Sequence, residues 1–136
     1  MNVLVDTSVW SLALRRKAVF DSAYVKELSE LIQELRVAMI GPIRQELLSG
    51  ISEESKYNTL RDTLRSFEDI PIETEHYEMA ARLFNHCRKK GIQGSAVDFL
   101  ICAVGIKNKL PIFTLDKDFE KYKGHMDIML YKIRKK

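Results

Sequence analysis

Residues that build disulfide frameworks or zinc sites are scarce in this sequence. It has two cysteines, Cys87 and Cys102, which lie 15 positions apart and form no CxxC pair. Its three histidines are scattered, and none is paired at a spacing typical of zinc ligands. The sequence therefore excludes a disulfide-stabilised scaffold and a zinc finger, and we expect a protein of the reducing cytoplasm.

Long apolar runs and strong charge of one sign are also absent. No apolar run approaches the ~18–20 residues of a membrane span, so we expect no membrane association. The N-terminus has no basic segment followed by an apolar one, and we therefore expect no signal peptide. The formal net charge of +3 is too small to identify a nucleic-acid partner, although it does not oppose a polyanionic substrate.

The composition indicates one globular domain. The chain has 136 residues, of which 46% are hydrophobic and 30% charged. This length fits a single domain over residues 1–136, and this balance is typical of a folded chain with its own core.

Predicted strands alternate with predicted helices. Apolar segments predict strands at about 3–5, 37–40, 111–114 and 128–131, and a short edge strand at 70–72. Apolar residues at helical spacing predict helices at about 8–16, 21–36, 42–48, 52–67, 75–90 and 95–107. This alternation predicts an α/β fold in which a central parallel sheet is covered by helices on both sides.

Acidic residues occur in otherwise apolar surroundings at separate places in the chain. They are Asp6 after the first strand, Glu46 in a helix, Asp98 at the start of an apolar helix, and Asp116 with Asp118 after a later strand. Parallel strands end at the same edge of a sheet, so we expect Asp6 and Asp116 to lie near each other. Clustered carboxylates repel one another unless a cation neutralises them, and oxygen ligands suit Mg²⁺ or Mn²⁺.

Each acid also has an ordinary structural explanation. Asp6 could cap the helix that begins near residue 8, although Thr7 or Ser8 could do so instead. Ser95-x-x-Asp98 matches a variant of the capping box. Asp116 and Asp118 fit turn positions, and Glu46 fits the solvated face of a helix. The residues alone leave these alternatives open.

Four short motifs, taken together, resemble the PIN-domain family, and within it the VapC-type toxins of bacterial and archaeal toxin–antitoxin pairs. The motifs lie at residues 5–8, 45–47 with Gly50, 98–103 and 114–119. The similarity spans essentially the whole chain. It implies a three-layer α/β/α domain and an endoribonuclease that depends on Mg²⁺ or Mn²⁺. It also implies a homodimer, an RNA substrate and a VapB-like antitoxin partner that blocks the active site.

The resemblance also assigns roles to residues. By position, Asp6, Glu46, Asp98 and Asp116 correspond to the acidic quartet that holds the metal and carries out catalysis. Asp118 is an alternative ligand to Asp116 at the fourth position. The hydroxyls that accompany these acids are supporting groups: Thr7, Ser8 and Thr114.

Other functions remain to be distinguished from this one. A non-catalytic PIN-like module that binds RNA or a protein partner is the main alternative, and a DNA nuclease with similar acids is another. A response-regulator receiver domain is disfavoured because the early acid is single and no central strand ends in Asp.

The basic segments at 15–17 and 132–136 fit either RNA contacts or solvated ends. We expect Trp10 in the core or a subunit contact, and Arg44 in a surface ion pair.

Overall fold

A three-stranded parallel sheet lies at the centre of the protein. The structure is a computed structural model that describes residues 1–15 and 22–134. Its strands are β1 (Val3–Val5), β2 (Val37–Ala38) and β3 (Ile112–Phe113), in the order β2-β1-β3. Leu4 lies opposite Ala38 on one side and Ile112 on the other. All three residues of β1 are fully buried, as expected of a central strand covered on both faces.

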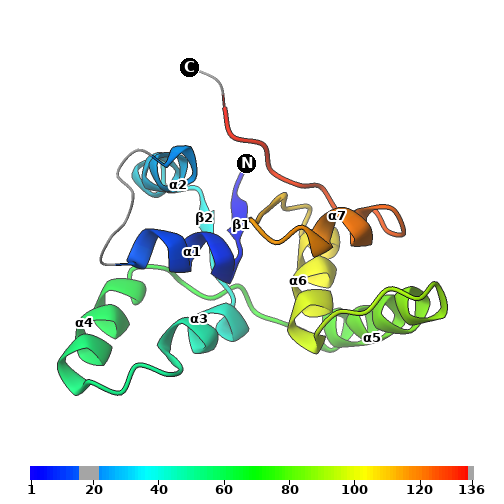
Figure 1. Cartoon of the computed structure of the whole chain (residues 1–136), viewed down its shortest axis with the longest axis horizontal. Helices are drawn as coiled ribbons and strands as arrows, with labels where there is room; N and C mark the ends of the chain where they lie inside the picture. Colours follow the sequence, from blue (N-terminus) through cyan, green and yellow to red (C-terminus); the bar gives the residue numbers. More distant parts are fainter. Residues whose placement is uncertain (16–21, 135–136) are drawn as a thin grey trace.

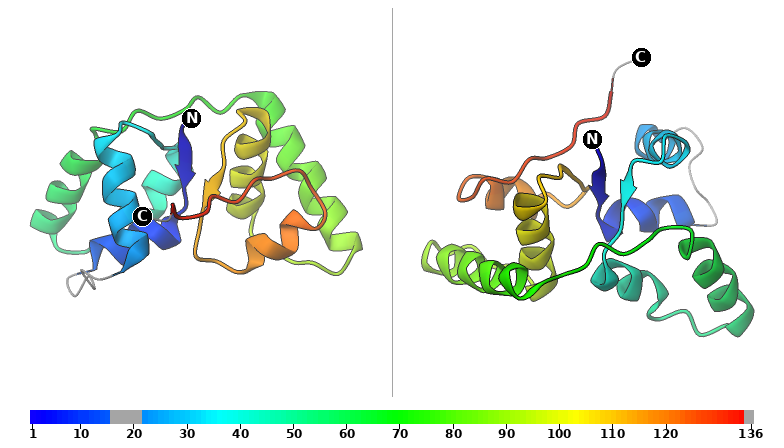
Figure 2. Two further views of the ribbon diagram at one scale, coloured as in Figure 1. Left: turned by 90° about the horizontal axis from the view of Figure 1, so that it is seen from above. Right: turned by 180° about the vertical axis from the view of Figure 1, so that it is seen from behind.

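Helices cover both sides of this sheet. Within residues 1–15 and 22–134 they are α1 (Thr7–Leu14), α2 (Ala23–Gln33), α3 (Gly41–Leu48), α4 (Glu54–Leu64), α5 (Thr74–Lys89), α6 (Ala96–Lys107) and α7 (Asp118–Lys123). Figures 1 and 2 show α1 to α4 on one side of the strands and α5 to α7 on the other. The predicted α/β/α fold with a central parallel sheet is confirmed. None of the described helices is long and apolar enough to span a bilayer.

Two strand predictions, the edge strand at 70–72 and the last strand at 128–131, were wrong. Residues 70–72 and 128–131 do not form strands, and the chain there makes only isolated parallel bridges, Met39 with Asp69 and Ile112 with Leu130. At the first bridge Ile70 donates its N–H to the Met39 carbonyl, but the following Pro71 has no N–H with which to extend a ladder. The bridges nevertheless place these two segments along the two outer edges of the sheet.

Helix ends also differ from the predictions. The helix predicted at 21–36 ends at Gln33, and Leu35 lies beyond it with φ of 58° and is 88% exposed. The helix predicted at 75–90 is α5, which begins at Thr74 with Glu73 as its N-cap. The helix α7 was not predicted. The predicted end of the first helix at residue 16 and the predicted start of the second at residue 21 lie outside the described residues.

A buried histidine joins α5 to α6, the helix whose first turn contains Asp98. His76 is 6% exposed, accepts the Glu73 N–H at Nδ1 over 2.9 Å, and contacts Asn108 Oδ1 through Nε2 over 2.7 Å. Because Nδ1 accepts a hydrogen bond, the proton is on Nε2, which donates to Asn108. The start of α5 is thereby tied to the end of α6, and this pairing helps to fix the direction in which α6 runs.

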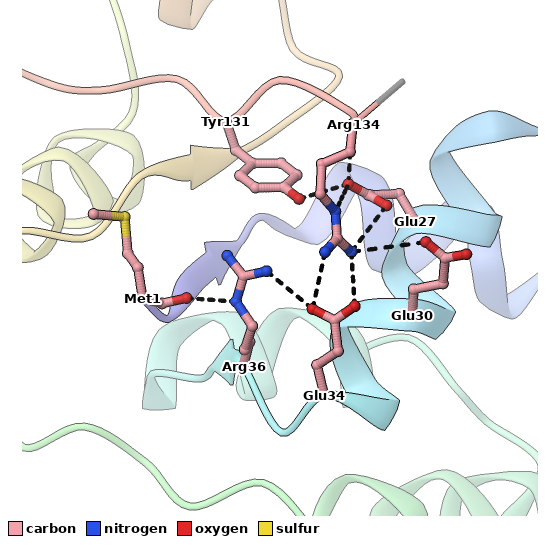
Figure 3. Close-up of polar contacts among 7 residues, drawn as sticks. All are labelled: Met1, Glu27, Glu30, Glu34, Arg36, Tyr131 and Arg134. Atoms are coloured by element: carbon pink, nitrogen blue, oxygen red, sulfur yellow. Dashed lines mark hydrogen bonds and ion pairs between the residues drawn. The ribbon is translucent and has the colours of Figure 1, made fainter. Parts of the chain in front are cut away.

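The C-terminal segment is held against α2 by a charged cluster, which we name the C-terminal clasp: Glu27, Glu30, Glu34, Tyr131 and Arg134 (Figure 3). Arg134 pairs with Glu27 and Glu34 at 3.0 Å each, and with Glu30 at 3.7 Å. The Tyr131 hydroxyl donates to Glu27 over 2.5 Å. Burial alone would raise the pKa of Glu27, but the hydrogen bonds from Arg134 and Tyr131 outweigh it and lower that pKa to about 2. Arg134 is therefore a structural residue of this segment.

Candidate active site

Asp6 lies at the carboxyl end of β1 with only 7% of its surface exposed. It occupies the N-cap position of α1, but its side chain makes no capping hydrogen bond. Instead, Oδ2 accepts hydrogen bonds from the hydroxyls of Ser8 and Thr114, each over 2.8 Å. The capping explanation for the Asp6 carboxylate is therefore wrong, and so is the expectation that Thr7 or Ser8 caps α1.

The two hydroxyls that hold Asp6 are themselves oriented by backbone. Ser8 Oγ accepts the Leu115 N–H over 2.9 Å, and Thr114 Oγ1 accepts the Asp116 N–H over 3.0 Å. An oxygen that accepts from a fixed N–H directs its own hydrogen elsewhere, and here both hydrogens point at Asp6. The loop after β3 thus fixes the position of the acid after β1. None of these bonds uses the second carboxylate oxygen of Asp6.

Glu46 reaches the same region from α3. Its side chain is exposed, and the Thr7 hydroxyl donates to it over a long 3.5 Å. Partial loss of water raises the pKa of Glu46, and the negative charges of Asp6 and Asp98 raise it further. The helix itself is anchored by Arg44, which pairs with Asp69 at 2.8 Å. Glu46 is therefore close enough to Asp6 and Asp98 to respond to their charge.

Asp98 stands in the first turn of α6 and is partly buried. Its N–H donates to the hydroxyl of the N-cap residue Ser95 over 3.0 Å, and its carboxylate accepts the Tyr122 hydroxyl over 2.8 Å. Burial raises the pKa of Asp98. The hydroxyls of Tyr122 and Ser95 oppose that rise, while the charges of Asp116 and Asp6 add to it. The predicted cap at Ser95 is confirmed, and it leaves the Asp98 carboxylate available to the site.

Asp116 and Asp118 both follow β3, but their side chains make different contacts. Asp116 Oδ1 accepts the Asp118 N–H over 2.9 Å, a turn that starts α7. Asp118 lies 3.7 Å from Lys121 Nζ within the first turns of α7. Asp116 is the one whose charge raises the pKa of Asp98. These contacts favour Asp116 over Asp118 as the fourth member of the acidic group.

The four acids come from four different elements and act on one another electrostatically. Across residues 1–15 and 22–134, however, no three Asp, Glu, His or Cys side chains are close enough to hold one ion together. Hydroxyl donors hold three of the carboxylates separately: Ser8 and Thr114 on Asp6, Thr7 on Glu46 and Tyr122 on Asp98. Carboxylates that repel one another, and whose pKa values are raised as a result, are suitable ligands for a divalent cation. To bind the same ion, these side chains must move closer together than they lie in this structure.

Two residues of this region were missed by sequence reasoning. Tyr122 of α7 is fully buried and packs against Phe99 and Phe119, with ring centroids 5.0 and 5.1 Å apart. Gly94 makes room for its hydroxyl, because a Cβ atom there would lie 2.3 Å from the Tyr122 oxygen. Burial raises the pKa of Tyr122, and the hydrogen bond to Asp98 raises it further, so the hydroxyl remains a donor. Nothing in the sequence near Asp98 signals a partner from α7.

Replacing Gly94 with alanine is expected to destabilise the protein by about 1–3 kcal/mol, the usual cost of overpacking. The added methyl must displace Tyr122, which is buried and hydrogen-bonded to Asp98. Urea denaturation measures the loss. Gly41→Ala is the matched control, because a Cβ there meets nothing within 4 Å. Adding Tyr122→Phe to Gly94→Ala should recover part of the loss, and full stability of Gly94→Ala would contradict this packing.

Other predictions away from the acids were resolved. Trp10 is 3% exposed and packs edge-on against Phe67 at 5.2 Å, so it is a core residue. Arg44 forms the expected ion pair, and it also donates to the carbonyls of Leu64 and Phe67. Both cysteines are free and buried, and burial raises the pKa of each thiol. Arg16 and Lys17 lie outside the described residues.

Comparison with known proteins gives consistent matches. The sequence profile of the PIN domain matches residues 3–125. A relative named VapC ribonuclease Mb1587, from Mycobacterium bovis, is 28% identical over 121 residues, which cover 87% of this chain and 89% of that protein. Two solved structures share the fold. FitAcB from Neisseria gonorrhoeae has a TM-score of 0.76 at 23% identity, covering 96% of each chain. VapBC2 from Rickettsia felis, bound to a DNA fragment from their promoter, has a TM-score of 0.77 at 18% identity, covering 96% of this chain and 98% of that chain.

Proposed function

The chain belongs to the PIN domain family, and from that premise we propose that it is a divalent-metal-dependent endoribonuclease, the toxin of a toxin–antitoxin pair. One observation carries the proposal. Asp6, Glu46, Asp98 and Asp116 come from separate parts of the chain and lie near enough to interact: burial raises the pKa values of Glu46 and Asp98, and the charges of neighbouring acids raise them further. The ribonuclease name of the Mycobacterium relative supports RNA as the substrate.

The donor set fits Mg²⁺ or Mn²⁺, which take carboxylate oxygens. In this proposal Asp6, Glu46, Asp98 and Asp116 hold the ion. Asp118 is the weaker candidate because Lys121 already faces its carboxylate. When bound, such an ion lowers the pKa of a water molecule and stabilises negative charge on a phosphodiester.

Positioning of the acids and transfer of the proton are the roles of the chain's own side chains. The hydroxyls of Ser8 and Thr114 keep Asp6 in one orientation. Asp98 is committed to its hydrogen bond with Tyr122, whereas Glu46 is exposed and only weakly bonded to Thr7. A carboxylate that is open to solvent and held by no strong hydrogen bond can reach a water molecule and accept its proton. We therefore assign to Glu46 the removal of the proton from the attacking water.

An antitoxin partner, a homodimer and a cytoplasmic location complete the proposal. They rest on family membership and on a further structural neighbour from Mycobacterium tuberculosis, which is described as a member of the VapBC family of toxin-antitoxin systems. An antitoxin that covers the acidic site would keep RNA away from it.

Removal of the metal tests the enzymatic part. Protein stripped of divalent ions should not cleave single-stranded RNA, and added Mg²⁺ or Mn²⁺ should restore cleavage because the acids otherwise repel the phosphodiester. Gel analysis of labelled RNA in excess EDTA and after add-back measures this. Equal cleavage in EDTA would refute the metal role. If the protein binds RNA but cleaves it with none of the metal ions tested, a non-catalytic module is favoured. If it cleaves DNA faster than RNA, DNA becomes the proposed substrate.

A further inference from the structure

A pocket of about 340 Å³ lies next to Asp116, between α2, β3, α7 and the C-terminal segment. The residues that matter for its chemistry are Tyr24, Phe113, Lys117, Lys123, Tyr131 and Lys132. Its volume is near the lower end of the range for small-ligand pockets, about 300–1,000 Å³. Since Asp116 lines it, the pocket opens directly beside the acidic site.

Aromatic rings form its walls. Phe113 is buried beneath, with the Tyr24 ring 6.2 Å away at 34° and the Tyr131 ring 5.2 Å away at 50°. Tyr24 is 41% exposed, so part of its ring remains available. Tyr131 cannot swing freely, because its hydroxyl is bound to Glu27 in the C-terminal clasp (Figure 3). The pocket thus presents aromatic surface that is already positioned.

Three exposed lysines accompany these rings: Lys117, Lys123 and Lys132. Within residues 1–15 and 22–134, the lysine ion pairs are those of Lys56 and Lys121. The three pocket lysines therefore carry positive charge that no described carboxylate neutralises by direct pairing. Asp116 and Glu120 are the acids on the lining, and the charge of Asp116 also acts on Asp98.

We propose that this pocket binds a nucleotide of the RNA strand adjacent to the bond that is cut. Exposed aromatic faces combined with unpaired lysines are the features with which proteins hold single-stranded nucleic acid. The base would stack against Tyr24, and the lysines would contact the neighbouring phosphates. The location beside Asp116 places this nucleotide next to the reacting phosphodiester. The inference rests on the proposed function for its choice of RNA.

Oligonucleotide binding tests the pocket without requiring cleavage. The probe is a short fluorescein-labelled single-stranded RNA, and its affinity for the Asp6→Asn variant is measured by fluorescence anisotropy. Adding Tyr24→Leu should weaken binding about tenfold through lost stacking, whereas Tyr24→Phe should retain it. The matched control is Tyr77→Leu, which removes a 55% exposed tyrosine from α5. Thermal melting verifies that each variant is folded.

Salt dependence tests the lysines. Each phosphate contact on a single strand contributes about 0.7 to the slope of log Kd against log salt, so Lys117→Ala or Lys123→Ala should reduce that slope by about this amount. Lys107→Ala, at the opposite end of α6 from Asp98, is the control and should leave the slope unchanged.

The outcomes separate this inference from the proposed function. Binding that depends on Tyr24 supports the pocket even if the wild-type chain cleaves no RNA. Equal RNA affinity with tyrosine or leucine at position 24 overturns the pocket even if cleavage is demonstrated. If the Tyr24 and lysine variants lose only the association with an antitoxin and keep RNA affinity, the pocket is a protein site and the RNA assignment is wrong.

Discussion

Asp6→Asn should reduce RNA cleavage at least about a hundredfold, in the range seen when a group that stabilises charge at a reacting centre is removed. The substitution is nearly isosteric, and the asparagine oxygen can still accept a hydrogen bond from Ser8 or Thr114. It removes a negative charge that raises the pKa of Glu46. The fold should therefore persist, with a melting temperature in EDTA equal to or above that of the wild type.

Two measurements besides activity check this prediction. Mg²⁺ or Mn²⁺ should raise the melting temperature of the wild type and have a much smaller effect on Asp6→Asn, because a ligand that binds the native state stabilises it. The pKa of Glu46, followed by NMR, should fall toward its ordinary value in the variant. Asp62→Asn, on the exposed face of α4, is the control. A variant that cleaves RNA at the wild-type rate would remove Asp6 from the mechanism.

Acid should weaken the fold through the C-terminal clasp. The pKa of Glu27 is lowered from 4.5 to about 2 in the native state. A lowered pKa means that the stabilisation is fully present above about pH 4.5 and is lost as the pH falls toward 2. A shift of this size corresponds to at most about 3 kcal/mol in the free energy of unfolding. Urea denaturation at a series of pH values measures it.

Glu27→Gln identifies the source of this acid sensitivity. The variant should be less stable than the wild type near neutral pH by roughly 1.5–3 kcal/mol, the value of hydrogen bonds to a charged group. Its stability should fall less steeply in acid, because residue 27 no longer takes up a proton. Glu78→Gln, an exposed position on α5, should keep the wild-type pH dependence. Parallel stability curves for Glu27→Gln and the wild type would contradict the role of the clasp.

The acids themselves could be located from the sequence because their positions follow local rules. Asp6 ends an apolar strand, and Asp98 follows a capping serine at the start of an apolar helix. For Asp98 the two explanations were not alternatives, since the cap uses its N–H and leaves its carboxylate to the site. The sequence could not rank Asp116 against Asp118, because both follow the same strand. The structure adds a difference between them: within residues 1–15 and 22–134, only Asp118 forms an ion pair with a lysine.

The long-range partners could not be predicted. Glu27 lies in a polar stretch of α2, and nothing nearby indicates that it is 2% exposed and paired with a residue 107 positions later. Arg134 belongs to a basic segment that fits a solvated tail equally well. Similarly, α7 has six residues, too few to establish a period, so its Tyr122 could not be assigned a direction. In each case the decisive contact depends on how distant elements pack.

The two isolated bridges have a consequence for how other molecules can approach. An open sheet edge invites a foreign strand to pair with it, which leads to β-augmentation or to aggregation. Here the Ile112 N–H and carbonyl are already bonded to Met129 and Tyr131, and the Met39 carbonyl is bonded to Ile70. A protein that recognises this chain must therefore bind helical faces or side-chain pockets, or else peel away one of these two covering segments first.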